Sequence, residues 1–424
     1  MFEIKGQFNT AYIFCDEGIE NEAYSQIQNF LNHEAFAQGR IAIMPDVHSG
    51  KGAVIGFTAA LSDKIIPNVI GVDIGCGVVS WRLGKRSDIG EPYEKLDKFI
   101  RNNIPSGRDT RDSKSELLES LFRTTFSRYD YPQFLAKIKE VAEHTHQNFD
   151  YVTHSLGTLG GGNHFIEIDR DEQDYLWLTI HSGSRNFGLK VAEFHQDVAE
   201  RRVCGIDEDE FKRRVEEIRQ TKKGKGIEVA IQKLRKDMTP KKRTGLEYLA
   251  GDDANKYFDH MNIAQMFARL NRRVMGADII KDLFKLDLKE LEVVESVHNY
   301  INFEDKVIRK GAISAHAGEK VIIPLNMADG ILLGTGLGNE SWNNSAPHGA
   351  GRKMSRHQAK EHIRLEDFQH VMAASKVWSS CVSKHTLDES PQAYKQADKI
   401  IQNVVETITV VNHMRPTYNF KASE

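Results

Sequence analysis

The sequence has few cysteines and lacks the pattern of a signal peptide or a membrane span. It has four cysteines among 424 residues, and these lie far apart with no Cys-x-x-Cys pair. This pattern is typical of reduced cytoplasmic proteins rather than of disulfide frameworks. The N-terminal residues show no basic region followed by an apolar core, and prolines, charges and glycines interrupt the longest apolar runs. We therefore expect a cytoplasmic protein with no signal peptide, no membrane span and no membrane partner.

The chain also lacks an excess of charge of either sign. Its formal net charge is −3 at pH 7, so the molecule as a whole has no electrostatic attraction to nucleic acid. A polyanionic partner would have to be bound locally. One segment at about 206–245 offers this, because residues 211–243 hold thirteen lysines or arginines against four acidic residues. This basic helical segment is either a solvated face or a contact to a phosphate backbone.

Apolar sequence is plentiful enough for a large core, since 40% of the residues are hydrophobic. Short β-branched runs predict strands in "RIAIMPDVHSGKG", "NVIGVDIGCG", "YLWLTIHSGSRN", "LEVVESVHNYINF" and "VIIPLNMADGILLGTG". Helical periodicity predicts helices in "YPQFLAKIKEVAEHTHQNF", "GLKVAEFHQDVAERRV", "NIAQMFARLNRRVMGAD" and "PQAYKQADKIIQNVVETITVV". Because these elements do not alternate steadily, we predict the α+β class and one large mixed α/β domain over 1–424 with a central active-site cleft.

Histidines end three of the predicted strands, where a sheet delivers functional side chains. Several potential metal ligands lie next to glycines or at the ends of predicted strands: His48, His164, His181, His298, Asp73 and Cys76. Taken singly, each fits an ordinary hydrogen-bonded or buried residue. Together, imidazole, carboxylate and thiolate form a ligand set that suits Mn, Fe, Co or Zn better than Mg or Ca. A thiolate can bridge two cations roughly 4 Å apart, a spacing used in phosphoryl transfer, so we predict that Cys76 is a metal ligand.

The segment "SAPHGAGRKMSR" has the composition of a phosphate-binding turn. The small residues 349–351 leave backbone N–H groups free, and Arg352 and Arg356 can pair bidentately with phosphate oxygens. His348 would then lie close enough to attack a nucleotide phosphate and form a phosphoramidate. Asp46 in "MPDVHSGKG" is our candidate for the carboxylate that orients it. The alternative is a glycine-rich turn without a chemical role.

The segment "GGGNHFIEI" has two interpretations. As a strand it places His164 on one face and Asn163, Phe165 and Glu167 on the other. His164 can then bind a metal while Glu167 accepts two N–H bonds from a guanine edge, which adenine does not offer. As a helix it would place His164 and Glu167 on the same face, and this division of roles would fail.

Eight of these motifs together resemble the RtcB family of RNA ligases. "PDVHSGKG", "GVDIGCG", "GGGNHFIE", "HSGSR", "VHN", "RKGA", "SAPHGAGR" and "AYK" occur in the order seen in that family, from about Ile41 to the C-terminus. The resemblance implies a GTP- and Mn-dependent ligase of RtcB fold. Such an enzyme joins an RNA 3′-phosphate or 2′,3′-cyclic phosphate end to a 5′-hydroxyl end through a GMP–histidine intermediate, in tRNA splicing or RNA repair.

The resemblance also implies roles for individual residues. One manganese ion would be held by Asp73, Cys76 and His164, a second by Cys76, His181 and His298, and the guanylylated histidine would be His348. The nucleotide contacts would fall on Asn163, His164, Phe165, Ile166, Glu167, His298, Asn299, Pro324, Asn326, Met327, Gly349, Ala350, Gly351, Tyr394 and Lys421. Independently of the resemblance, residue type predicts that Arg185, Arg352 and Arg356 contact RNA phosphates. For Arg185, an ordinary surface loop is the alternative.

The sequence departs from the family pattern at two places. "IIPLNMADG" replaces a Gly-Ser-Met-Gly turn with Leu325 and Asn326, and "SAHAG" places His316 where the family has arginine. These changes predict a divergent branch. Its partners would be RNA ends and an archease-type activator, and we expect a monomer or a weak dimer.

Two other functions compete with a ligase. One is a dinuclear metal phosphodiesterase that opens cyclic phosphates on RNA ends without storing a nucleotide. The other is a catalytically silent RNA-binding or structural metal protein. The combination of "HGAG", Glu167 and Lys421 favours the ligase, because only nucleotide binding needs all three.

Overall fold

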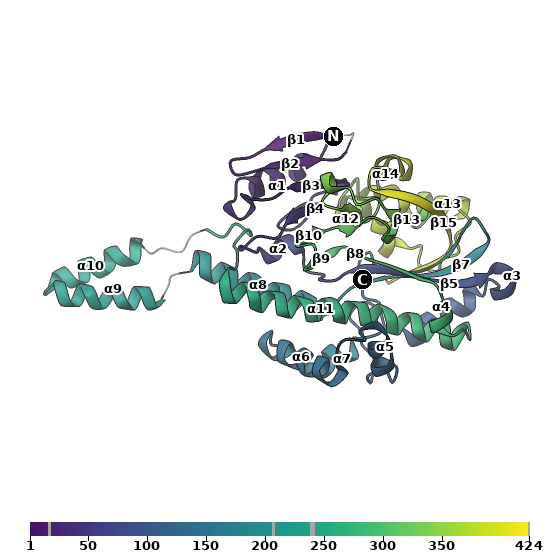
Figure 1. The fold of residues 1–424 in the computed structure, drawn as a ribbon, viewed down its shortest axis with the longest axis horizontal. Coiled ribbons are helices and arrows are strands. Elements are labelled where there is room, and N and C mark those ends of the chain that lie inside the picture. The colour runs from purple at the N-terminus through teal and green to yellow at the C-terminus, as the bar shows by residue number, and fades with distance from the viewer. Residues whose placement is uncertain (16–17, 206–207, 238–241, 423–424) are drawn as a thin grey trace.

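The computed structural model describes residues 1–15, 18–205, 208–237 and 242–422, and sheets with flanking helices build its body (Figure 1). A six-stranded sheet has the order β1-β2-β3-β4-β10-β9. All of its neighbouring strands are antiparallel except the parallel pair β2–β3. Its strands are β1 (Phe2–Lys5), β2 (Thr10–Ile13), β3 (Ile41–His48), β4 (Ile55–Ala60), β10 (Val307–Lys310) and β9 (Asn299–Asn302).

A seven-stranded antiparallel sheet with the order β12-β13-β15-β6-β7-β5-β8 carries the C-terminal strand in its interior. Its strands are β12 (Lys320–Asn326), β13 (Gly330–Gly336), β15 (Ile408–Lys421), β6 (Phe165–Arg170), β7 (Tyr175–Ser182), β5 (Gly77–Lys85) and β8 (Val293–Val297). A short pair, β11 (Ala312–Ser314) and β14 (Ser345–Pro347), completes the described sheets. Mainly antiparallel sheets with separate helices confirm the predicted α+β class.

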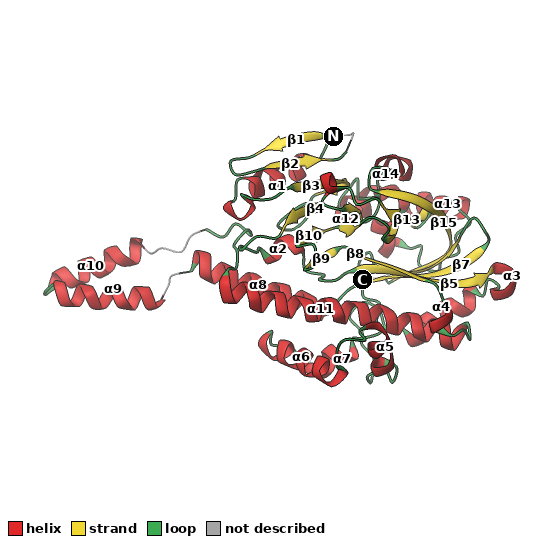
Figure 2. Ribbon diagram, viewed as in Figure 1, coloured by secondary structure: helices red, strands yellow, loops and turns green. Residues whose placement is uncertain are grey.

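The helices lie around these sheets, and Figure 2 shows α8 and α11 running along one side of them. The α-helices are α1 (Asn21–Leu31), α2 (Pro67–Ile70), α3 (Arg86–Ile89), α4 (Tyr93–Asn103), α5 (Leu118–Thr125), α6 (Tyr131–His144), α7 (Phe149–His154), α8 (Arg185–Cys204), α9 (Glu208–Thr221), α10 (Lys225–Asp237), α11 (Gly251–Asp278), α12 (Arg356–His362), α13 (Leu365–Ala374) and α14 (Ala397–Val404). Shorter helical turns are η1 (Glu34–Phe36), η2 (Ile279–Leu283), η3 (Leu288–Glu290), η4 (Glu340–Trp342), η5 (Lys384–Glu389) and η6 (Pro391–Ala393). Within the described residues, none of the helices combines the length and the apolar character needed to cross a bilayer.

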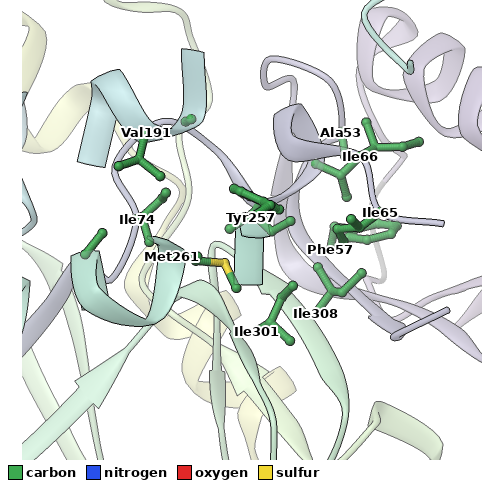
Figure 3. Packing of buried hydrophobic residues seen from close by; sticks show 14 of the residues in the cluster. Ala53, Phe57, Ile65, Ile66, Ile74, Val191, Tyr257, Met261, Ile301 and Ile308 are labelled. Carbon is green, nitrogen blue, oxygen red and sulfur yellow. The ribbon is translucent and has the colours of Figure 1, made fainter. Parts of the chain in front are cut away.

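The largest hydrophobic core joins the long helices to the six-stranded sheet (Figure 3). Ile74 is fully buried in this core together with Val191 of α8 and Met261 of α11. Burial of a side chain of this size contributes roughly 1.5–3 kcal/mol. Ile74 therefore anchors the turn on which Asp73 and Cys76 stand.

Two predicted elements differ from the structure. The stretch "NVIGVDIGCG" is not a strand: it forms the short helix α2 and a turn, and β5 begins only at Gly77. Pro67 stands in the first turn of α2, and Gly71 and Gly75 have φ angles of 97° and 72° that no regular strand contains. The predicted C-terminal helix ends at Val404, and the β-branched run that follows belongs to β15.

The predicted basic segment at about 206–245 contains helices α9 and α10. Residues 206–207 and 238–241 of this segment lie outside the described residues. Figure 1 shows the two helices side by side, well away from the sheets.

Candidate functional site

The register of four neighbouring strands in the seven-stranded sheet brings the predicted metal ligands together at the ends of these strands. Gly77 of β5 pairs with Ser182 of β7 on one side and with Val297 of β8 on the other. Phe165 of β6 pairs with His181 of β7. Each predicted ligand is one of these paired residues or an immediate neighbour of one, except Asp73 in the preceding turn. The four segments therefore deliver their ligands to a common point.

The ligand atoms lie at close range to one another. The Sγ atom of Cys76 is 3.5 Å from Nε2 of His164 and 3.3 Å from Nε2 of His181. His164 Nε2 is 3.0 Å from Asp73 Oδ2, and His181 Nε2 is 3.3 Å from His298 Nε2. The sulfur thus stands between the two halves of the predicted ligand set.

Hydrogen bonds fix the histidine tautomers in the form that binds metals. Nδ1 of His164 donates to the carbonyl oxygen of Leu159 at 2.9 Å, and Nδ1 of His181 donates to that of Asn163 at 3.2 Å. Because a carbonyl oxygen only accepts, Nδ1 of each ring carries a proton, and either ring in its neutral form presents a lone pair at Nε2. These lone pairs face the Cys76 sulfur, which is the arrangement that a cation stabilises.

Burial sets the charge of this group. It lowers the pKa of His181 and of His298 well below the ordinary value, so both rings stay neutral. Burial also opposes ionisation of Asp73, but the hydrogen bond and charge of His164 bring the pKa of Asp73 to about 2. Burial and Asp73 raise the pKa of the Cys76 thiol well above its usual range. A cation is therefore needed to hold the thiolate.

The residues fit a metal centre in kind and in position. Ligand atoms of Cys76, His164 and His181 lie within 4.8 Å of one another, and no other group of three such side chains does so among the described residues. Thiolate and imidazole donors suit Mn, Fe, Co or Zn better than Mg or Ca.

The sequence analysis missed Arg272 and Glu295, which stabilise the backbone next to the metal ligands. The buried guanidinium of Arg272 donates to the carbonyl oxygens of Gly75 and Ser182, both at 2.8 Å. It forms an ion pair at 3.0 Å with Glu295 of β8. The apolar run "LEVVESV" contains two glutamates, and nothing in the sequence distinguishes the buried Glu295 from Glu292.

His348 follows strand β14 and is held by Asp46 of β3. Asp46 Oδ2 accepts a hydrogen bond from His348 Nδ1 at 2.7 Å and one from the His348 backbone N–H at 3.3 Å. Asp46 is fully buried. Gly351 lets the two segments approach, because a Cβ there would stand 2.3 Å from the Asp46 carbonyl oxygen. In its neutral form the ring therefore has its lone pair on Nε2, and its centroid lies 4.8 Å from that of His298.

A cavity of about 950 Å³ is lined by His348 and by Asp73, Cys76, His181 and His298 of the ligand group. Its lining includes most of the predicted nucleotide contacts, namely Asn163, Phe165, Glu167, His298, Asn299, Pro324, Asn326, Met327, Gly349, Ala350, Gly351, Tyr394 and Lys421. His164 and Ile166 are not among the lining residues. His164 contacts Asp73 and Cys76 instead, and strand alternation turns Ile166 into the second hydrophobic core. His48 is in the cavity wall, where its Nδ1 donates to the Asp46 carbonyl oxygen at 2.9 Å. Burial lowers the pKa of His48 to about 4.

The strand interpretation of "GGGNHFIEI" is correct from Phe165 onward, since β6 begins there. His164 contacts the metal ligands, whereas Phe165 and Glu167 line the cavity. Asn419 of β15 donates to Glu167 Oε2 at 2.5 Å. Burial and the neighbouring Asp169 raise the pKa of Glu167 well above its usual range.

Glu389, which the sequence analysis also missed, is the centre of a buried ion cluster at the far wall of the cavity. Its carboxylate accepts from Arg356 at 2.6 Å, from the Tyr394 hydroxyl at 2.8 Å and from Lys421 Nζ at 2.7 Å. Burial opposes its ionisation, but the charges of Lys421 and Arg356 bring the pKa of Glu389 to about 2. The sequence "LDESP" gives no sign that this acid is buried.

The three arginines predicted to meet RNA phosphate are all bound to protein groups. Arg352 donates to the Asp388 carbonyl oxygen at 2.6 Å, and Arg356 pairs with the Asp388 carboxylate at 2.6 Å. Both line the cavity. Arg185 does not line it and donates to Thr158 Oγ1 at 2.9 Å and to the Gly107 carbonyl oxygen at 2.6 Å.

Replacing Glu389 with glutamine is expected to lower the free energy of unfolding by about 3–5 kcal/mol, because it leaves buried cations without their counter-charge. The folded-state pKa lies below the ordinary value, so the carboxylate stabilises the fold above about pH 4.5 and loses this effect as the pH falls toward 2. Thermal unfolding of E389Q and wild type across this pH range measures both effects. The exposed Glu366 gives the matched control E366Q. A variant as stable as wild type at neutral pH would contradict the prediction.

Comparison with known proteins shows the family to which this chain belongs. A family model described as "tRNA-splicing ligase RtcB" matches residues 26–422. This chain belongs to the RtcB family. It is 32% identical to the RNA-splicing ligase RtcB of Escherichia coli (strain K12), over 94% of this chain and 93% of that protein. It is 27% identical to the tRNA-splicing ligase RtcB of Aeropyrum pernix, over 88% of this chain and 86% of that protein.

The two departures from the RtcB pattern have local explanations. Asn326 closes its own turn, because its Oδ1 accepts from the backbone N–H groups of Ala328 and Asp329 at 2.9 and 3.0 Å. A register shift between Pro324 and Asn326 keeps this turn in the cavity wall, while Leu325 packs into a hydrophobic core. His316 pairs with Asp305 at 3.0 Å.

Proposed function

We propose that this chain is an RNA ligase that uses GTP to join an RNA 3′-phosphate or 2′,3′-cyclic phosphate end to a 5′-hydroxyl end. The observation that carries the proposal is that His348, held by Asp46 through a 2.7 Å hydrogen bond, lines the same cavity as Cys76. The names of the relatives favour a ligase over the phosphodiesterase alternative.

His348 would act as the nucleophile in the first step. The lone pair on Nε2 attacks the α-phosphorus of GTP, the bond to the bridging oxygen breaks, and pyrophosphate leaves. Asp46 holds the proton on Nδ1 and compensates the positive charge that forms on the ring. The product is GMP bound to His348 as a phosphoramidate.

Two further transfers would complete the reaction. An oxygen of the RNA 3′-phosphate attacks the phosphorus of the bound GMP, which frees His348 and leaves an RNA–GMP anhydride. The 5′-hydroxyl then attacks the RNA phosphate, forms the phosphodiester and expels GMP. A 2′,3′-cyclic phosphate end must first be hydrolysed to the 3′-phosphate.

The ligand group would hold two cations, for which we propose Mn²⁺. Asp73, Cys76 and His164 would hold one of them, and Cys76, His181 and His298 would hold the other. Bound cations supply charge neutralisation for phosphate oxygens during each transfer.

Guanine would be recognised at the opposite end of the cavity. Glu167 can accept two N–H bonds from the guanine edge, and their donation favours the carboxylate over the protonated acid. Lys421, held at 2.7 Å by Glu389, offers N–H donors to guanine acceptors. Phe165 and Tyr394 supply aromatic surface in the same wall.

Incubation with α-phosphate-labelled GTP and Mn²⁺ tests the proposal. We expect a covalent label that is stable to alkali, is lost in acid and is absent from the variant His348→Ala. The exposed His370 of α13 gives the matched control H370A, which should be labelled like wild type. A metal-loaded wild-type protein that takes up no label would refute the proposal.

A further inference from the structure

Helices α9 and α10 form a hairpin that extends away from the body of the molecule (Figure 1). With 14 and 13 residues, each helix is about 20 Å long. The turn between them lies at the tip of the hairpin and reads "KKG", followed by Lys225 and Gly226 at the start of α10. None of the residues assigned to the cavity lies in this hairpin.

Most apolar residues of the hairpin are partly or fully buried, and Val229 of α10 is the exposed exception among the described residues. Phe211, Val215 and Ile218 lie on one side of α9 and are half-buried, and Leu234 of α10 is buried. Arg235 places its guanidinium 6.0 Å from the Phe211 ring centroid. The outward faces are therefore left to charged side chains.

These charged side chains are mostly basic. Of the side chains that the structure describes from Phe211 to Arg235, nine are lysines or arginines and three are glutamates, and all twelve are exposed. Two of the glutamates are paired within α9, Glu217 with Arg213 at 2.6 Å and Glu216 with Arg219 at 3.7 Å. This positive surface belongs to a chain whose net charge is −3, so it is a local feature.

The tip carries the strongest part of this charge. Lys222, Lys223 and Lys225 are exposed, and no acidic side chain among the described residues forms an ion pair with any of them. Each keeps its full hydration and its side-chain freedom. Such lysines bind phosphate groups as point charges, without reading a sequence.

We infer that this hairpin is a second RNA-binding element, which contacts the phosphate backbone of the substrate RNA at a distance from the ends being joined. The inference rests on the proposed function, since it takes RNA as the substrate. Protein interfaces are depleted in lysine and enriched in aromatic residues, so this surface does not have the composition of a protein-binding site. A phosphate backbone, in contrast, is bound by positive charge alone. The hairpin selects RNAs with a folded body large enough to reach its tip.

The variant K222Q/K223Q/K225Q tests the inference because it removes three charges and no packing. We expect the affinity for a long hairpin RNA to fall about tenfold or more, and the slope of log affinity against log salt to become less steep by about 2 to 3. The KM for ligating this RNA should rise while kcat stays unchanged. Ligation of short single-stranded oligonucleotides and labelling of His348 should match wild type.

Two matched variants complete the experiment. The charge-preserving K222R/K223R/K225R should retain binding, and neutralisation of three exposed lysines elsewhere, K95Q/K98Q/K289Q, should leave the salt slope unchanged. An unchanged salt slope in the tip variant would overturn the inference. So would unchanged RNA binding together with lost binding to polyglutamate, because this would assign the hairpin to an acidic protein. If wild type failed to join even short ends, the ligase proposal would fall, and the binding comparison would still decide the role of the hairpin.

Discussion

Replacing Cys76 with serine is expected to remove bound metal and to lower the ligation rate by about 10³-fold or more. Loss of a residue that only orients a metal ligand already costs about 10–100-fold in affinity or activity. Cys76 lies within 3.5 Å of ring nitrogens from both halves of the ligand group, so its loss affects both proposed ions. A serine hydroxyl stays protonated at neutral pH and offers no anionic sulfur in return.

Elemental analysis of the purified variant, together with its ligation rate, measures this effect. Cys381 provides the control C381S, because it is also buried but lies 3.7 Å from Arg101 in another part of the molecule. Both variants remove a buried thiol, so a general effect on packing would appear in both. A C76S protein with the metal content and rate of wild type would show that the sulfur is a packing group.

The local features of the site were predictable because they depend on neighbours in the sequence. A histidine at the end of an apolar run, as at His181, indicates a side chain presented at the edge of a sheet. For the segment from Phe165, the alternation of residues indicated a strand but left a helix open, and the structure decided for the strand. The register that brings Cys76 to His181 was not predictable, because it depends on β5 lying between β7 and β8, which are distant in the chain.

The missed residues share a physical reason. Glu389 and Arg272 are charged and buried, and burial of a charge is favourable only when partners are present. The partners of Glu389 are Arg356, Tyr394 and Lys421, and each lies on a different segment of the chain. A single carboxylate in the sequence gives no sign of this arrangement and resembles a solvated one. The prediction of a strand for "NVIGVDIGCG" was wrong for a different reason. Its apolar residues are typical of a strand, whereas its glycines form backbone turns.

Asp46 is the residue whose conservative replacement tests the orientation of His348 most directly. Its Oδ2 atom accepts both the Nδ1–H and the backbone N–H of His348, and it is fully buried. In the variant Asp46→Asn, an amide nitrogen facing Nδ1 would donate a hydrogen bond instead of accepting one. The neutral ring would then carry its proton on Nε2, and the lone pair that attacks GTP would be lost.

We expect D46N to form the GMP adduct about 10²–10⁴-fold more slowly than wild type, the range in which a misplaced histidine proton acts in other enzymes. GTP affinity and thermal stability should change little in comparison, because Asp46 touches His348 rather than the nucleotide. Single-turnover labelling measures the rate. The control is D305N, which removes a largely buried carboxylate that pairs with His316 and with the buried Arg309 outside the cavity. If D46N and D305N both labelled at the wild-type rate, Asp46 would serve only to position backbone, and the nucleophile would need another source of activation.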